Sequence, residues 1–129
     1  DEDGNVTEVH CTYDPETKSG SGFNARKVKG TIHWVCADTA QKAEVRLYEN
    51  IVDEEKGVYN EDGSINLNPN SLTVMDNCFV EPALAEAEPT ESFQFVRHGY
   101  FCVDSKDSSK DHLVFNRIVS LKSSYRPNK

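Results

Sequence analysis

The sequence predicts an all-β protein, a barrel or sandwich of roughly six or seven short strands with two short helical turns. Three observations support this prediction. Apolar and polar residues alternate along several short segments, clusters of Gly, Pro, Asn and Asp separate these segments, and only two stretches carry helix-start signals. The chain of 129 residues is long enough for one domain or two small subdomains.

Each expected strand follows from a local alternation of side chains. In residues 28–36, for example, Ile32, Trp34 and Cys36 share one side. The segment after Glu91 alternates strongly until it is interrupted near His98-Gly99. The expected strands are residues 6–13, 28–36, 44–48, 72–80, 93–104 and 113–122.

Two short helical turns and three polar loops connect these strands. Asp38 is a suitable N-cap for one or two turns through residue 43, and Pro82 is placed for the first turn of a helix over residues 81–87. The loops are residues 14–25, the acidic stretch 53–63 and residues 105–111.

Composition and charge limit the class of protein. The hydrophobic share of 36% makes wholesale disorder unexpected, and no apolar run reaches the roughly 18–20 residues needed to span a bilayer. The net charge of −8 argues against a protein that coats nucleic acid or anionic membranes. However, residues 25–48 and 93–129 are net basic, so the sequence leaves open both an ordinary charged surface and a local face for a polyanion.

The cysteines indicate the redox compartment of the protein, and the start of the chain indicates whether the sequence is part of a longer protein. No cysteine belongs to a C-x-x-C pair, so we expect four buried, reduced thiols and no zinc site, with two disulfides of a secreted domain as the alternative. No secretory signal is visible at the start of the sequence, and the sequence does not begin with Met. Asp3-Gly4 indicates a hairpin turn whose first strand is missing, which suggests a fragment of a longer protein.

The residues reveal no catalytic signature. G-x-S-x-G, G-x-x-x-x-G-K-[ST] and H-E-x-x-H patterns are all missing, and the four histidines are scattered. The acidic pairs Glu54-Glu55 and Asp107/Asp111 lack the spacing of a calcium loop, so we interpret them as solvated charges.

One segment has the chemistry to read an unstacked base. If Phe93 and Phe95 face the core, Gln94 faces outward, and Arg97 lies on the phenylalanine side unless the strand bends near Gly99. Glutamine offers both a donor and an acceptor, and arginine offers a fork of donors. A strand with ordinary polar positions has the same spacing, so spacing alone does not decide.

Several longer motifs occur in a characteristic order. They are K-V-K-G-T-I-H-W-V (27–35), E-V-R-L-Y (44–48), N-P-N-S-L (68–72), E-P-A-L (81–84), F-Q-F-V-R-H-G-Y-F-C-V-D-S (93–105) and V-F-N-R (114–117). Together they closely resemble the C-terminal anticodon-binding region of glutaminyl-tRNA synthetases. The likeness runs from about residue 6 to residue 122, which makes it a specific signal.

The resemblance implies an antiparallel β-barrel of the ribosomal protein L25 type, appended to a class I aminoacyl-tRNA synthetase. In that family a glutamine–tRNA ligase joins glutamine to tRNA(Gln) with ATP and magnesium, using H-I-G-H-like and K-M-S-K-S-like motifs that this sequence lacks. The chain is therefore expected to bind without catalysing, with no cofactor or metal of its own. Residues 26–104 would form most of the distal barrel, and residues 1–25 and 105–129 would be shared with or return to the proximal barrel.

The resemblance also implies site residues and partners. Gln94 and Arg97 match the family's pocket for the splayed anticodon, mainly its central uridine, and Val96 stands where the family often has glutamate. Lys27, Lys29 and Arg117 are candidates for contacts with the tRNA backbone. The expected partners are the tRNA(Gln) anticodon loop and the catalytic and proximal-barrel parts of the longer chain, in a cytoplasmic monomer without membrane contact.

Three alternatives remain at this point. The first is the corresponding domain of a glutamyl-tRNA synthetase, and the second is a free-standing ribosomal-RNA-binding protein like L25. The third is an extracellular β-sandwich, which would need paired cysteines. Because other anticodon-contacting arginines of the family lie upstream of this chain, the chain alone is expected to bind tRNA weakly.

Overall fold

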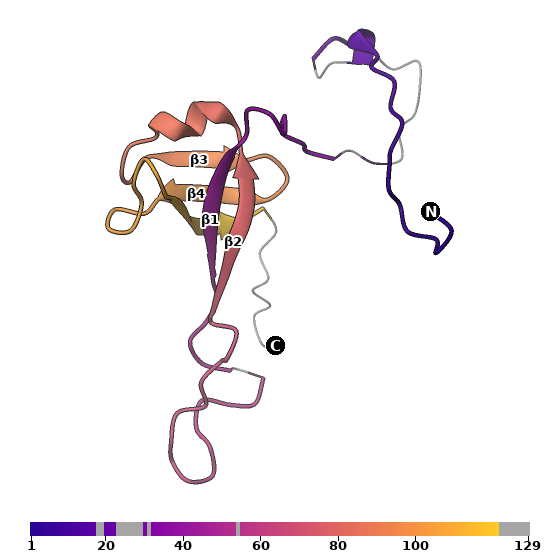
Figure 1. Cartoon of the computed structure of the whole chain (residues 1–129). Helices are drawn as coiled ribbons and strands as arrows, with labels where there is room; N and C mark the ends of the chain where they lie inside the picture. Colours follow the sequence, from indigo (N-terminus) through magenta and orange to yellow (C-terminus); the bar gives the residue numbers. More distant parts are fainter. Residues whose placement is uncertain (18–19, 23–29, 31, 54, 122–129) are drawn as a thin grey trace. The chain divides into compact units, whose positions relative to one another are not determined.

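The structure is a computed structural model that describes residues 1–17, 20–22, 30, 32–53 and 55–121. The chain divides into two units, Asp1–Ile32 and His33–Lys129. In the first unit, the regular element found among the described residues is the 3-10 helix η1 (Pro15–Thr17). The second unit holds the remaining elements and the core (Figure 1).

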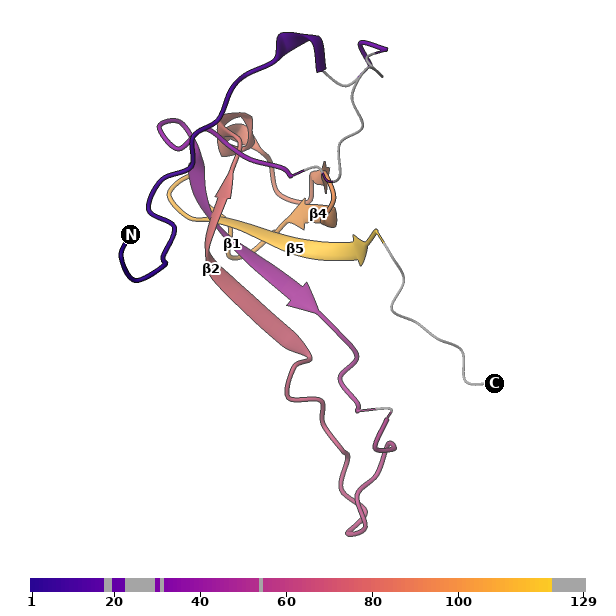
Figure 2. The ribbon, with the colours of Figure 1, turned by 90° about the vertical axis from the view of Figure 1, so that its right-hand side faces the viewer.

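The second unit is built on one five-stranded sheet with the order β2-β1-β5-β4-β3. Neighbouring strands are antiparallel except β1 and β5, which run parallel with Ala43 opposite Leu113 (Figures 1 and 2). A 3-10 helix, η2 (Pro82–Glu86), joins the β1–β2 hairpin to the β3–β4–β5 meander. The strands are β1 (Gln41–Tyr48), β2 (Leu72–Val80), β3 (Ser92–Phe95), β4 (Gly99–Val103) and β5 (Leu113–Ser120).

This arrangement confirms the all-β class and the short helical turns but differs in detail from an antiparallel barrel. The sheet is mixed because β5, the last strand of the meander, lies beside β1 and runs parallel to it. Within the described residues the recorded strand pairings also leave β2 and β3 as the two edges, so the sheet is open.

The core lies on one face of this sheet. Buried residues alternate along β4, where Gly99, Phe101 and Val103 are inside, and β5 adds Phe115, which is fully buried. The half-buried Phe95 packs against the same cluster. The remaining core residues are Ala43, Val45, Val80 and Leu113, whereas Val114, between Leu113 and Phe115, is buried on the opposite face of β5.

Most expected elements of the second unit are confirmed. β2 covers the predicted residues 72–80, the break near Gly99 separates β3 from β4, and the predicted helix at 81–87 is the 3-10 helix η2 with Pro82 in its first turn. β5 begins as predicted at Leu113, whereas Lys122 lies outside the described residues. The helical turns expected from Asp38 to residue 43 are wrong, because a turn at 37–39 leads directly into β1.

The strand predicted at residues 6–13 is wrong, and the one at 28–36 is not found in its described part. Residues 6–13 have no strand structure, and residues 30 and 32–36 have none either. An isolated segment leaves its backbone donors and acceptors without ladder partners, so alternation by itself does not make a strand.

The cysteines differ from expectation in their burial. All four are free thiols, as expected. Cys78 in β2 and Cys102 in β4 are half-buried, but Cys11 and Cys36 are exposed because neither belongs to a strand. The prediction that all four are buried inside strands is therefore wrong for Cys11 and Cys36.

A long projection leaves the sheet between β1 and β2. Residues 49–71, here called the arm, extend beyond the ends of both strands (Figures 1 and 2). Two isolated bridges, Val52 with Leu67 and Tyr59 with Ile65, hold its two sides together. None of the helices in the described part of the chain is long and apolar enough to cross a membrane.

Candidate nucleic-acid interface

The β3–β4 hairpin positions Gln94 on the outer surface. Phe93 and Phe95 are half-buried against the core, while Gln94 between them is exposed and pairs across the hairpin with Tyr100. The expected alternation of this strand is therefore confirmed. In the described part of the chain, the Gln94 side chain makes no hydrogen bond, so its donor and acceptor are both available to a ligand.

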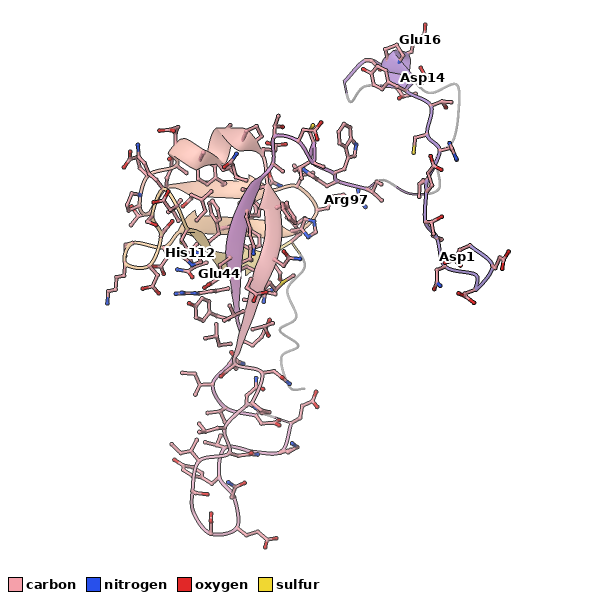
Figure 3. All side chains as sticks on the ribbon, in the orientation of Figure 1. Asp1, Asp14, Glu16, Glu44, Arg97 and His112 are labelled. Atoms are coloured by element: carbon pink, nitrogen blue, oxygen red, sulfur yellow. The ribbon has the colours of Figure 1, made fainter. Side chains whose placement is uncertain are left out.

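Arg97 lies in the turn that follows β3. The His98 N–H donates to the Phe95 carbonyl at 2.9 Å, and Arg97, the third residue of this turn, has a φ of 71°. A positive φ at the third position alone is typical of a type II turn, which favours Gly or Asn. The chain bends there, so Arg97 points away from the phenylalanine side and is exposed (Figure 3). Among the described residues, its guanidinium has no ion-pair or hydrogen-bond partner.

Gly99 makes this hairpin possible. It has a φ of 151° and pairs with Ser120 on β5. A Cβ atom at this position would lie 2.6 Å from the Val119 carbonyl oxygen, closer than any side chain tolerates. Glycine is therefore required both by the backbone conformation and by the approach of β5.

A hollow of about 430 Å³ lies beside Gln94. Val96 and His98 line it as well, whereas Arg97 between them does not. The structure thus places the two predicted reading residues on one hairpin, with only Gln94 facing the hollow. The other lining residues are His33, Trp34, Val35, Phe79, Val80, Glu81, Ala83, Leu84, Phe93 and Phe95.

The aromatic walls of this hollow were not identified from sequence. Trp34 is 73% exposed and Phe79 is 55% exposed, although both line the hollow. The His33 Nε2 atom lies 3.8 Å from the Glu81 Oε1 atom, which brings the segment before β1 next to the start of η2. The side-chain alternation predicted Trp34 in a strand, on the same side as Ile32. Only the position of Trp34 in the I-H-W-V motif pointed to the anticodon-binding region.

The residues predicted to contact the tRNA backbone lie in different surroundings. Arg117 on β5 forms an ion pair with Glu49, and its Nη2 atom is 3.5 Å from the Tyr48 carbonyl oxygen. Its side chain is 18% exposed, so an RNA phosphate would have to compete with Glu49 for it. Lys27 and Lys29 lie outside the described residues.

A second cluster of charges ties the loop after β4 to β1. The Arg46 guanidinium contacts Glu44 and Asp107, each at 2.6 Å, and these two carboxylates raise the pKa of Arg46. The backbone N–H of Asp107, the Asn116 amide and the backbone N–H of Lys106 lower the pKa of Asp104 to about 2. Arg46 is thus paired with carboxylates of both β1 and the loop after β4, so the cluster stabilises the loop.

Glu44 also joins this cluster to His112. Its Oε2 atom lies 3.3 Å from the His112 Nε2 atom, and both residues are labelled in Figure 3. In the described residues, no three His, Cys, Asp or Glu side chains are grouped so that they could hold a metal ion.

A known protein family matches the part of the chain that contains the β3–β4 hairpin and the hollow. The family model described as "tRNA synthetases class I (E and Q), anti-codon binding domain" matches residues 31–104. This range is more than half of the chain and includes every residue that lines the hollow. The chain therefore belongs to this family of anticodon-binding domains.

The chain is also similar to proteins named glutamine–tRNA ligase. It is 55% identical over 130 residues to the one from Clostridium perfringens, covering 98% of this chain and 23% of the relative. It is 51% identical to those from Vibrio vulnificus and Clostridioides difficile, covering 97% and 100% of this chain and 22% and 24% of the relatives. The chain thus spans about a quarter of the length of these relatives.

Proposed function

We propose that this chain is the anticodon-binding part of a glutamine–tRNA ligase and helps the longer protein to select tRNA(Gln) for aminoacylation. The observation that supports this most directly is the β3–β4 hairpin, where Gln94 and Arg97 are exposed and have no side-chain partners among the described residues. Relatives of that name are similar over nearly the whole chain.

The two side chains have distinct roles in this proposal. Gln94 donates to and accepts from the edge of an unstacked anticodon base, mainly the central uridine, and Arg97 adds a fork of donors to the same base. Lys27, Lys29 and Arg117 contact phosphates, which positions the RNA without reading its sequence. For Arg117 this contact requires that its ion pair with Glu49 opens or is shared.

The remaining chemistry belongs to the longer protein. We place ATP and magnesium in its catalytic part, and we assign residues 26–104 mostly to the distal barrel. Residues 1–25 and 105–129 are then shared with or return to the proximal barrel. The longer protein would be a cytoplasmic monomer whose partners are tRNA(Gln) and its own catalytic and proximal-barrel parts.

A glutamate–tRNA ligase is the second candidate, because the family description covers both the E and the Q enzymes. The two candidates differ in the amino acid and tRNA that the longer protein uses. The test is to measure aminoacylation of tRNA(Gln) and tRNA(Glu) with radiolabelled glutamine and glutamate. Charging of tRNA(Gln) with glutamine alone supports the proposal, whereas charging with glutamate contradicts it.

A further inference from the structure

The hollow beside Gln94 has aromatic walls to which the proposed reading of the anticodon assigns no role. Trp34 and Phe79 come from different segments, and both are more than half exposed where they line it. Large apolar side chains that remain exposed around a hollow are typical of a binding surface. The same aromatic rings are the groups on which single-stranded RNA bases stack.

The size and the polar groups of the hollow fit a single base. Its volume of about 430 Å³ lies within the range of small-molecule pockets, roughly 300–1,000 Å³. A nucleobase offers a flat face for stacking and an edge with donors and acceptors. Trp34 and Gln94 both line the hollow; Trp34 carries a flat aromatic ring, and Gln94 carries an amide with a donor and an acceptor.

The charges near the hollow are compatible with RNA. Glu81 is the acidic residue among those that line it, and His33 lies 3.8 Å from its carboxylate. Arg97 follows the lining residue Val96 directly, and its guanidinium has no partner in the described part of the chain. A base in the hollow would therefore meet the Glu81 carboxylate, and the Arg97 cation lies next to the lining residue Val96 along the chain.

We propose that Trp34 is the stacking platform for one unpaired RNA base, with Phe79 as a second aromatic wall of the same hollow. Gln94 then hydrogen-bonds the edge of the stacked base. This inference rests on the proposed function, since that proposal supplies the RNA. It adds a specificity-determining contact made by a residue outside the β3–β4 hairpin.

Trp34 is the single tryptophan of the chain, so its fluorescence reports on the hollow directly. The probe is a labelled RNA stem–loop that carries the anticodon loop of tRNA(Gln). Its binding to the 129-residue chain is measured by anisotropy, and Trp34 emission is recorded in the same titration. A series of loops with one abasic nucleotide at each position then identifies the base that quenches Trp34.

We expect quenching by the intact loop and loss of quenching with one particular abasic loop. Trp34→Leu should weaken binding by roughly 5- to 150-fold, while Trp34→Phe keeps an aromatic face and most of the affinity. Tyr59→Leu is the control, because Tyr59 is exposed on the arm and does not line the hollow. Circular dichroism checks that each variant is folded.

The outcomes separate this inference from the proposed function. If the RNA binds but Trp34 emission does not change and Trp34→Leu binds normally, the stacking role is overturned and the proposed function stands. In that case, another segment of the longer protein is the better candidate for covering the hollow. If the stem–loop binds neither this chain nor the longer protein, even in large excess, both proposals fail.

Discussion

Phe95 stacks on Phe101 with ring centroids 4.5 Å apart and ring planes 19° from parallel. Phe95 also meets the fully buried Phe115 edge-on at 5.3 Å. Because Gln94 precedes Phe95 and the turn with Arg97 follows it, these rings fix the hairpin against the core. Packing of the core and placement of the reading residues therefore depend on the same side chain.

Replacing Phe95 with leucine should affect both properties. Each lost ring contact should lower the free energy of unfolding by about 0.5–1.5 kcal/mol beyond the change in buried area. RNA binding should weaken as well, because Gln94 is less firmly held. Urea unfolding and the stem–loop titration measure the two effects, and Tyr59→Leu serves as the control without ring contacts. Unchanged stability in Phe95→Leu would show that the stack does not contribute.

Gly99→Ala should destabilise the protein more than Gly63→Ala. Both glycines have positive φ, which costs an alanine about 1–2 kcal/mol. Gly63 has open space around it, whereas a Cβ at Gly99 meets the Val119 carbonyl oxygen. Because of the extra steric conflict, Gly99→Ala should have the lower free energy of unfolding of the two variants in urea. Equal losses would mean that β5 moves away without cost.

Arg97→Asn should separate stability from RNA recognition. Asparagine tolerates the left-handed backbone better than arginine does, so relief of part of this strain should raise the free energy of unfolding by about 0.5–1 kcal/mol. In the longer protein, Arg97→Ala should cost about 1–3 kcal/mol of discrimination at one anticodon position. A uniform loss across anticodon variants would instead identify Arg97 as a phosphate contact.

Asp104 should make the fold sensitive to acid. Its pKa is lowered from 3.8 to about 2 in the folded state, so its stabilising effect is complete above pH 4 and is lost as the pH falls from about 4 towards 2. The effect should amount to about 2 kcal/mol. Asp104→Asn should reduce stability at pH 7 and flatten the pH profile of urea unfolding. Asp111→Asn, an exposed position in the same loop, should leave the profile unchanged.

The sequence predicted those elements whose pattern and boundaries are local. β2, η2 and the interrupted β3–β4 segment have clear alternation or a proline start, and their ends are marked by turn residues. The parallel pairing of β1 with β5 was not predicted, because side-chain alternation does not specify which strand is the neighbour. The same limitation explains the failed strand at residues 6–13.

The site was predicted in part for similar reasons. The outward position of Gln94 follows from alternation with Phe93 and Phe95, and it is confirmed. The exposure of Trp34 depends on how the segment before β1 lies against the hairpin, and no local pattern reports this. The ion pair of Arg117 with Glu49 likewise joins residues far apart in the chain.

The parallel pair of β1 and β5 has a consequence for biosynthesis. β1 is an inner strand of the sheet, but its second neighbour β5, which carries the buried Phe115, begins only at Leu113 of the 129 residues. Until then β1 can pair only with β2, and such a hairpin alone is marginally stable in water. Folding of this unit during translation must therefore wait until β5 has left the ribosome, and a chain that stops before Leu113 would expose its apolar face to proteases and chaperones.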